Sequence, residues 1–126
     1  FRHLKESKLR LKKWRHPKKK YELEIIDLPM PAVITRPAKG EALASLDASR
    51  SGRQGRRGEQ LPASYANFIF VNGGIIVPVF NCDADKEAIR IFNKVFPKRK
   101  IISIDATLLI QEGGGIHCMS KQEPLA

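Results

Sequence analysis

Two short β-rich runs separated by a turn sequence constrain the fold of this chain more than any other feature. Residues 67–71 and 75–80 are rich in the β-branched and aromatic residues that strands prefer, and Asn-Gly-Gly occupies positions 72–74. Asparagine and glycine tolerate the positive φ that a tight turn requires. The pattern therefore predicts a β-hairpin. Pro78 lacks a backbone donor, so we expect it where the second strand needs no ladder partner.

A helical period and a further β-rich run follow the hairpin. Apolar residues recur at helical spacing and Pro97 ends the pattern. The predicted buried face consists of Ala88, Ile89, Phe92, Val95 and Phe96. Asp83 or Asp85 can cap this helix, and residues 100–104 predict a third strand. The order over residues 64–104 is therefore strand, strand, helix, strand, an α/β unit.

The amino-terminal part predicts a helix and a strand. Leu4, Leu11 and Trp14 recur at helical spacing between basic residues, and the alternation over residues 21–28 is typical of a strand. Residues 32–61 lack periodicity and are expected to be mostly loop. The chain thus carries about one and a half ββαβ units, which suggests a piece of a repeat architecture in which one copy cannot bury its faces alone.

The formal net charge of +10 is concentrated in residues 1–20. This segment holds ten of the 23 basic residues and one of the 13 acidic ones, which leaves 13 basic and 12 acidic residues for the rest. Such a segment could attach to phosphates. Because no aromatic ladder or recognised binding motif accompanies it, we expect a solvated basic helix and no nucleic-acid partner.

Length and composition exclude several classes of protein. A chain of 126 residues suffices for one domain. It contains no apolar run of the roughly 20 residues that span a bilayer and no signal peptide, so we expect a cytoplasmic protein without a membrane partner. Two cysteines, Cys82 and Cys118, provide neither a disulfide framework nor a CxxC metal site. We therefore predict no metal and no cofactor.

A glycine run leads directly to the second cysteine. Gly113, Gly114 and Gly115 allow the backbone to approach a flat ligand closely, and Cys118 is a candidate nucleophile. The run could instead be a flexible loop, and Cys118 a small buried hydrophobe. In extended chain His117 would point to the opposite face, so the base for Cys118 should come from elsewhere.

Six short segments carry a resemblance to a known family. They are LPMP (28–31), LPASYANF (61–68), VNGG with IIVP (71–78), FP (96–97), IDA (104–106) and GGGIHCMSKQEP (113–124). In order and spacing the chain resembles the carboxy-terminal part of agmatine deiminases, members of the bacterial-type peptidyl-arginine deiminase family. The resemblance covers about residues 21–124.

The resemblance implies a fold, an activity and a set of site residues. The fold is the pentein-type α/β propeller of ββαβ units, with residues 1–126 the carboxy-terminal part of one deiminase domain. The activity is hydrolysis of agmatine to N-carbamoylputrescine and ammonia, a step of putrescine biosynthesis, through a covalent thiouronium intermediate. Cys118 matches the nucleophile, and Asn67, Gly114 and Gly115 match substrate-binding positions. Asn67 could equally serve only to bond the start of its strand.

The sequence also departs from the family's pattern. The family's carboxylates and its proton-shuttling histidine come from earlier blades and include a His-x-Asp motif, whereas none of the three histidines here is followed by aspartate two places later. We therefore expect these residues alone to be inactive. Glu112 stands where many members have a further glycine, and neither it nor Asp105 is assigned a role.

Three alternatives remain open at this stage. The substrate could be peptidyl-arginine or another guanidine in place of agmatine. The chain could be a basic nucleic-acid-binding module without catalysis, or Cys82 and Cys118 could form a redox pair. A homo-oligomer is possible for the full-length protein.

Overall fold

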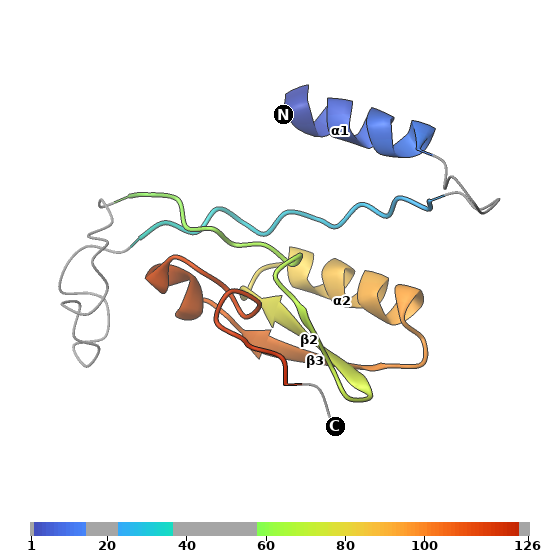
Figure 1. The fold of residues 1–126 in the computed structure, drawn as a ribbon. Coiled ribbons are helices and arrows are strands. Elements are labelled where there is room, and N and C mark those ends of the chain that lie inside the picture. Colours follow the sequence, from blue (N-terminus) through green and yellow to red (C-terminus); the bar gives the residue numbers. More distant parts are fainter. Residues whose placement is uncertain (1, 15–22, 37–57, 124–126) are drawn as a thin grey trace, which may run out of the picture.

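The computed structural model describes residues 2–14, 23–36 and 58–123 (Figure 1). Within them the elements are α1 (Arg2–Lys13), β1 (Ile69–Val71), β2 (Gly74–Val79), α2 (Ala84–Val95), β3 (Lys100–Asp105) and the 3-10 helix η1 (Leu109–Glu112). The order β1-β2-α2-β3 is the predicted ββαβ unit. None of the helices in these ranges is long and apolar enough to cross a membrane.

The predicted hairpin is confirmed. β1 and β2 pair antiparallel with Ile69 opposite Ile76, and Gly73 in the turn has a φ of 74°. β3 pairs with β2 in parallel, which gives the sheet order β1-β2-β3 and makes α2 the crossover between β2 and β3. Figure 1 shows α2 lying across one face of this sheet.

The position of Pro78 satisfies the predicted constraint. Because β1 begins at Ile69, opposite Ile76, Pro78 lies beyond the end of that strand. On the side of β2 that faces β3, the ladder bond is made by the next residue, Val79, whose carbonyl accepts from the Ala106 amide at 2.9 Å. Pro78 is therefore placed where the ladder requires no donor from it.

The core lies between the sheet and α2. The buried apolar residues are Leu61, Tyr65, Ile75, Val77, Phe80, Ala88, Phe92, Ala106 and Ile110. Ala88 and Phe92 come from the predicted face of α2, with Ile89 and Phe96 packed against the cluster. Phe92 contacts Phe68 edge to face at a centroid distance of 4.9 Å. Burying a side chain of this size contributes about 1.5–3 kcal/mol.

The start of α2 distinguishes between the two predicted caps. Asp83 occupies the N-cap position in a helical conformation, and its side chain makes no capping hydrogen bond. Asp85 instead accepts hydrogen bonds from the amides of Phe80 and Cys82, in the turn before the helix. Asp85 is the second residue of α2, and its side chain therefore holds the preceding turn against the start of the helix.

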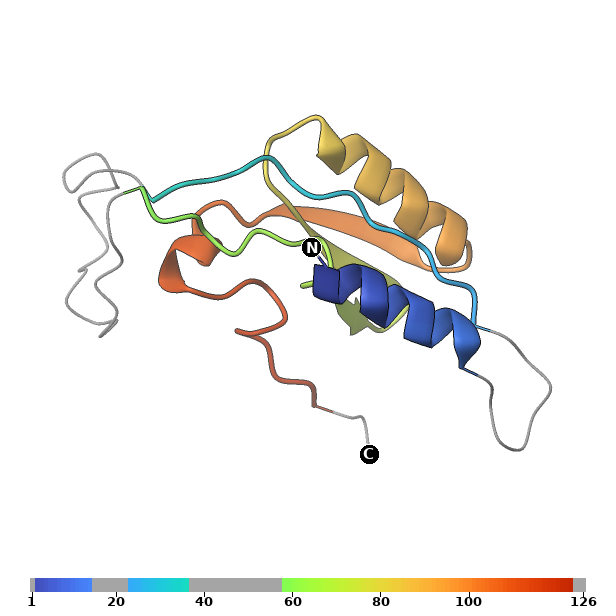
Figure 2. The same cartoon turned by 90° about the horizontal axis from the view of Figure 1, so that it is seen from above.

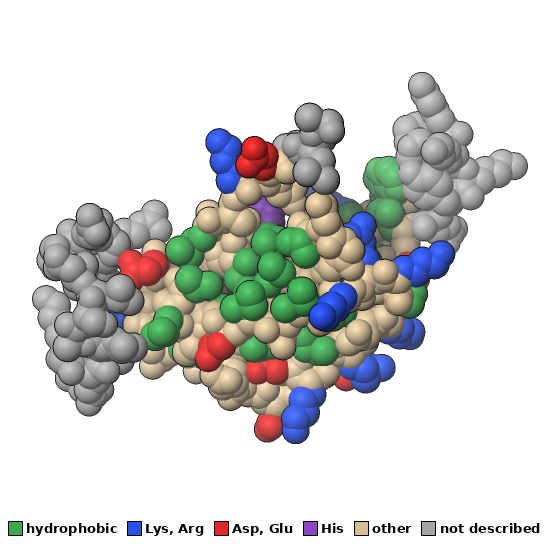
Figure 3. Space-filling view, turned by 90° about the horizontal axis from the view of Figure 1, so that it is seen from below, with side chains coloured by type: hydrophobic (Ala, Val, Ile, Leu, Met, Phe, Trp, Pro, Cys, Tyr) green, Lys and Arg blue, Asp and Glu red, His purple; other side chains and the backbone are tan. Residues whose placement is uncertain are grey.

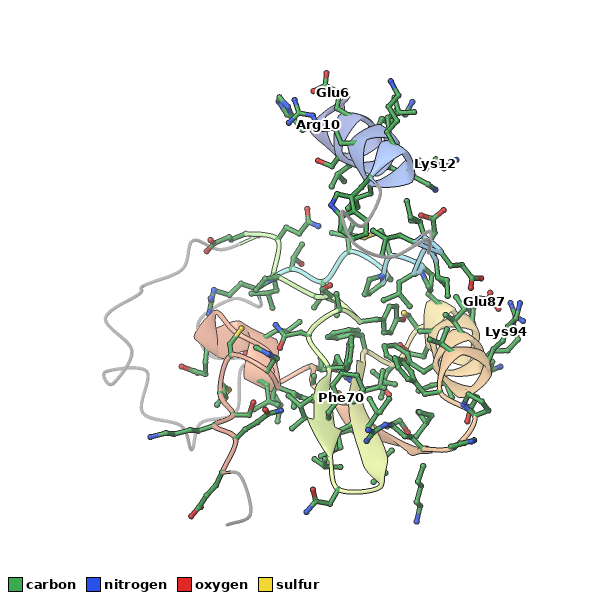
Figure 4. All side chains as sticks on the ribbon, turned by 45° about the vertical axis from the view of Figure 1, so that its right-hand side comes forward. Glu6, Arg10, Lys12, Phe70, Glu87 and Lys94 are labelled. Atoms are coloured by element: carbon green, nitrogen blue, oxygen red, sulfur yellow. The ribbon has the colours of Figure 1, made fainter. Side chains whose placement is uncertain are left out.

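The amphipathic helix predicted near the amino terminus is α1, and its apolar residues are exposed. Leu4 is 67% exposed and Leu11 47%. Figures 1 and 2 place α1 on the α2 side of the sheet, and Figure 4 shows Arg10 and Lys12 projecting from opposite sides of the helix. An ion pair between Lys8 and Asp27 connects α1 to the segment that follows.

The predicted strand over residues 21–28 is wrong where it can be judged. Residues 21 and 22 lie outside the described residues, and residues 23–34 belong to no strand. Alternation indicates which side chains share a face, but a strand also needs a partner for its backbone groups. This segment has an isolated β-bridge further along the chain, where Thr35 pairs with Gln60.

The same bridge joins the two ends of the predicted 32–61 loop. The amide of Leu61 donates to the carbonyl of Ile34 at 2.8 Å, and that of Arg36 to Glu59 at 2.9 Å. Residues 37–57 of the predicted loop lie outside the described residues. The structure therefore describes one ββαβ unit with α1 and a paired segment beside it.

The sheet face opposite α2 is partly open. Ile102 and Ile104 of β3 project from this face, and they are 37% and 41% exposed. Figure 3 views the molecule from that side and shows apolar side chains gathered over its centre. A single ββαβ unit covers one of its two sheet faces, as expected for a unit of a repeat architecture.

Candidate active site

The fold brings Asn67 and Cys118 into contact. Asn67 ends a turn over residues 64–67 just before β1, and Cys118 lies in a turn after η1. The side-chain Nδ2 of Asn67 donates a hydrogen bond to Cys118 Sγ at 3.2 Å, between residues 51 positions apart. The side-chain Oδ1 of Asn67 accepts a hydrogen bond from the His117 amide at 2.6 Å. One amide side chain thus bonds both the thiol and the backbone before it.

The glycine run makes this contact possible. A Cβ at Gly115 would lie 2.7 Å from Asn67 Cγ and 2.8 Å from its Oδ1, distances that real Cβ atoms do not show. A Cβ at Gly114 would lie 3.0 Å from the Cβ of Cys118. Gly113 adopts a φ of 86° and ends η1 in the left-handed conformation. In the structure Gly114 and Gly115 lie close to Cys118 and Asn67, whereas the expected approach of this backbone to a flat ligand stays a prediction.

The backbone around Cys118 is a turn, which corrects the assumption of extended chain. The amide of Met119 donates to the carbonyl of Gly115 at 3.3 Å, and that of Ser120 to His117 at 3.2 Å. Alternation of neighbouring side chains therefore does not apply to His117 and Cys118. His117 enters the site through its backbone, whose amide donates to the Asn67 side chain.

The surroundings of Cys118 favour its thiolate. The thiol is exposed, and its pKa is lowered chiefly by the Asn67 side-chain hydrogen bond, with a further contribution from the Gly115 backbone. A donor aimed at sulfur stabilises the charged form over the neutral one. The alternative of a buried Cys118 is therefore wrong, and the lowered pKa favours the thiolate form on which a nucleophilic role would depend.

Cys82 has different surroundings. It is half-buried at the start of α2, with its Sγ 3.4 Å from the Tyr65 hydroxyl and 3.7 Å from Asp85 Oδ1. Both cysteines are free. In the structure Cys82 belongs to the packing between the turn and α2, and its contacts are separate from those of Cys118.

The acidic residues near the glycine run have structural contacts. Asp105 accepts hydrogen bonds from Asn81 Nδ2 at 2.8 Å and from the Thr107 amide at 2.8 Å. The hydrogen bond from the Thr107 hydroxyl is the largest cause of the lowered pKa of Asp105. Glu112 is exposed at the end of η1. Within the described ranges there is no group of three or more His, Cys, Asp or Glu that could hold a metal ion.

Comparison with known proteins identifies the family. The sequence model of the Porphyromonas-type peptidyl-arginine deiminases matches residues 1–124. A putative agmatine deiminase from Vibrio parahaemolyticus is 40% identical over 115 residues, which cover 89% of this chain and 30% of that protein. The agmatine deiminase of Ectopseudomonas mendocina is 34% identical over 82% of this chain and 27% of its own length. The chain thus spans about three tenths of the curated relatives it matches.

Solved structures agree with these relatives. The agmatine deiminase of Enterococcus faecalis superposes with a TM-score of 0.77 at 28% identity, over 95% of this chain and 32% of that one. A putative peptidyl-arginine deiminase superposes with a TM-score of 0.74 at 25% identity, over all of this chain and 31% of its own. The mixed α/β fold described above is therefore that of the corresponding part of these proteins. This chain belongs to the Porphyromonas-type peptidyl-arginine deiminase family.

Proposed function

We propose that this chain supplies the nucleophile of a deiminase that converts agmatine to N-carbamoylputrescine and ammonia. Cys118 is the nucleophile, and Asn67, Gly114 and Gly115 form the adjoining part of the substrate site. The observation that carries the proposal is the exposed Cys118 thiol with the Asn67 amide directed at its sulfur at 3.2 Å.

The chemistry explains why such a thiol is needed. A guanidinium is a resonance-stabilised cation and a poor electrophile, so a soft nucleophile held as thiolate suits its carbon. Attack by Cys118 Sγ forms a C–S bond and a tetrahedral adduct. Collapse of this adduct breaks a C–N bond and releases ammonia, with one proton delivered to the leaving nitrogen. Water then adds to the carbon of the resulting S-alkylthiouronium and gives up two protons to a general base. Collapse of this second adduct breaks the C–S bond, returns Cys118 as a thiolate and releases the ureido product.

The local geometry supports the covalent steps. Gly114 and Gly115 carry no side chain where the chain passes Cys118 and Asn67, so the Asn67 amide can pack against this backbone and reach the sulfur. The Asn67 amide stabilises the thiolate before attack and again when it leaves. These residues provide the nucleophile and its immediate support.

The remaining groups belong to other parts of the proposed protein. Binding a guanidinium requires carboxylates that accept from its nitrogens, and proton transfer requires a general acid and base. We propose that these groups come from other ββαβ units of a pentein-type propeller, of which residues 1–126 form the carboxy-terminal part. The open sheet face at Ile102 and Ile104 is consistent with such neighbours.

The names of the similar proteins favour agmatine over peptidyl-arginine as the proposed substrate. The curated relatives 40% and 34% identical to this chain are named a putative agmatine deiminase and an agmatine deiminase. Among the solved structures, the agmatine deiminase of Enterococcus faecalis is 28% identical and the putative peptidyl-arginine deiminase 25%. Agmatine also requires a pocket for a free alkylamine, while peptidyl-arginine requires room for a backbone.

Ammonia release tests the proposal. The protein expressed from its complete coding sequence should release ammonia from agmatine and much less from a peptide containing arginine, and Cys118→Ser should abolish both rates. A higher rate with the peptide would reverse the substrate assignment. Undiminished turnover by Cys118→Ser would rule out the mechanism.

A further inference from the structure

The carboxylate of Asp85 joins three segments of the chain. Its Oδ1 accepts a hydrogen bond from the Tyr65 hydroxyl at 2.6 Å and one from the Phe80 amide at 3.0 Å. Its Oδ2 accepts from the Cys82 amide at 3.0 Å and from the Phe80 amide at 3.2 Å. The loop before β1, the end of β2 and the start of α2 are therefore bonded to one side chain. Charge-assisted bonds of this kind are stronger than neutral ones.

Tyr65 is the member of this set that leads toward the candidate active site. Its side chain is 1% exposed and lies edge-on to the Phe80 ring, with centroids 5.5 Å apart. Burial and the bond to Asp85 raise the pKa of the Tyr65 hydroxyl, so it remains a donor at all ordinary pH values. Tyr65 is thus a buried anchor whose hydroxyl donates to Asp85 and also lies 3.4 Å from Cys82 Sγ.

The turn that contains Tyr65 also carries Asn67. The carbonyl of Ser64 accepts from the Asn67 amide at 3.2 Å, and the Ser64 hydroxyl accepts from the Ala66 amide at 3.2 Å. This short turn directs Tyr65 inward to Asp85 and Asn67 toward Cys118. A shift of the turn would change the distance between Asn67 Nδ2 and Cys118 Sγ, because a single residue, Ala66, separates the anchor from the donor.

We propose that Asp85 is a positioning residue, which acts through the Tyr65 hydroxyl to hold the Asn67 amide against the Cys118 thiol. Its hydrogen bonds go to Tyr65, Phe80 and Cys82 and not to Cys118. The inference rests on the proposed function in one respect, namely that Cys118 is the reactive thiol. Asp85, at the start of α2, thereby influences the reactivity of Cys118, which lies in a distant segment of the sequence.

Tyr65→Phe tests the proposal, because it removes one hydroxyl and keeps the buried ring. The measurement is the rate of Cys118 alkylation by iodoacetamide as a function of pH, followed by mass spectrometry of the peptide that carries Cys118. The protein is the one expressed from its complete coding sequence. We expect the rate at pH 7 to fall by about three-fold and the profile to move to higher pH, as for a thiol that has lost part of its stabilising donor. Asp85→Asn should give a larger loss, since an amide nitrogen then faces backbone donors.

A matched core variant separates positioning from general loosening. Ile75→Val truncates a fully buried side chain of β2 that is not bonded to Asp85, and it should leave the alkylation profile in place. An unchanged profile in Tyr65→Phe, or an equal shift in Ile75→Val, would overturn the proposal. Asn67→Ala should give the full shift. If Asn67→Ala shifts the profile and Tyr65→Phe does not, positioning by Asp85 fails, while turnover of Cys118→Ser tests the proposed function separately.

Discussion

The side-chain amide of Asn67 donates a hydrogen bond to the thiol of Cys118 at 3.2 Å, across 51 positions of sequence. The turn before β1 and the turn after η1 meet only in the folded chain. The contact requires Gly115, because a side chain there would occupy the space of the Asn67 amide. A thiol, its donor and the glycine that admits the donor therefore form one unit.

Cys118→Ser should lower the deimination rate of the protein expressed from its complete coding sequence by at least about three orders of magnitude, as removal of nucleophiles does elsewhere. A serine hydroxyl is far less ionised than a thiol at neutral pH. Cys82→Ser should remain near the wild-type rate. Initial-rate assays of ammonia release measure both. Preferential labelling of Cys82 by a haloacetamidine probe would contradict the assignment.

Asn67→Ala should raise the pKa of the Cys118 thiol. The Asn67 hydrogen bond is the largest cause of the lowered pKa, and its removal destabilises the thiolate, so less thiolate is present at any pH below the new pKa. The alkylation profile of Cys118 should move to higher pH. Asn93→Ala is the matched control, since Asn93 is an exposed asparagine of α2 whose amide donates to the Ile89 carbonyl. If the alkylation profiles of Asn67→Ala and Asn93→Ala coincided, the Asn67 hydrogen bond would not be the cause of the lowered Cys118 pKa.

Gly115→Ala should reduce both the deimination rate and the stability of the folded protein. The new Cβ would lie 2.7 Å from Asn67 Cγ, so the Asn67 side chain must move away from Cys118. We expect a loss of activity of at least ten-fold, with destabilisation of about 1–3 kcal/mol from overpacking. Turnover and thermal unfolding measure the two effects. Ala66→Ser, at an exposed position of the neighbouring turn, should change neither.

The 126 residues by themselves should release no ammonia from agmatine above the buffer rate. Catalytic groups that act as a unit contribute far less to the rate when they are separated. Without carboxylates to bind the guanidinium, the thiolate has no bound substrate, and without a proton donor the ammonia cannot leave. The open sheet face predicts a broad, weakly cooperative melt. Measurable turnover that depends on Cys118 would show that a base and a clamp exist within this chain, and the first residues to test would be Asp105, Glu112, His117 and Glu123.

The sequence by itself determined most of the local elements and named the candidate site residues. Asn-Gly-Gly at 72–74 specifies a turn through the φ values these residues tolerate, and the helical period around Phe92 specifies α2 and its buried face. Family motifs single out Cys118 and Asn67. Signals of this kind are local, because they depend on neighbours a few positions away in the chain.

Tertiary structure decided what required distant partners. Alternation over residues 21–28 predicts a strand, yet residues 23–28 form none, since a ladder depends on a second segment that the pattern does not specify. Asp85 is one of two candidate caps in the sequence, and only the fold shows it bonded to Tyr65. The need for glycine at position 115 follows from the approach of Asn67. Hydrogen bonds and steric exclusion act over a few ångströms in space, so contacts between remote positions are set when the chain packs.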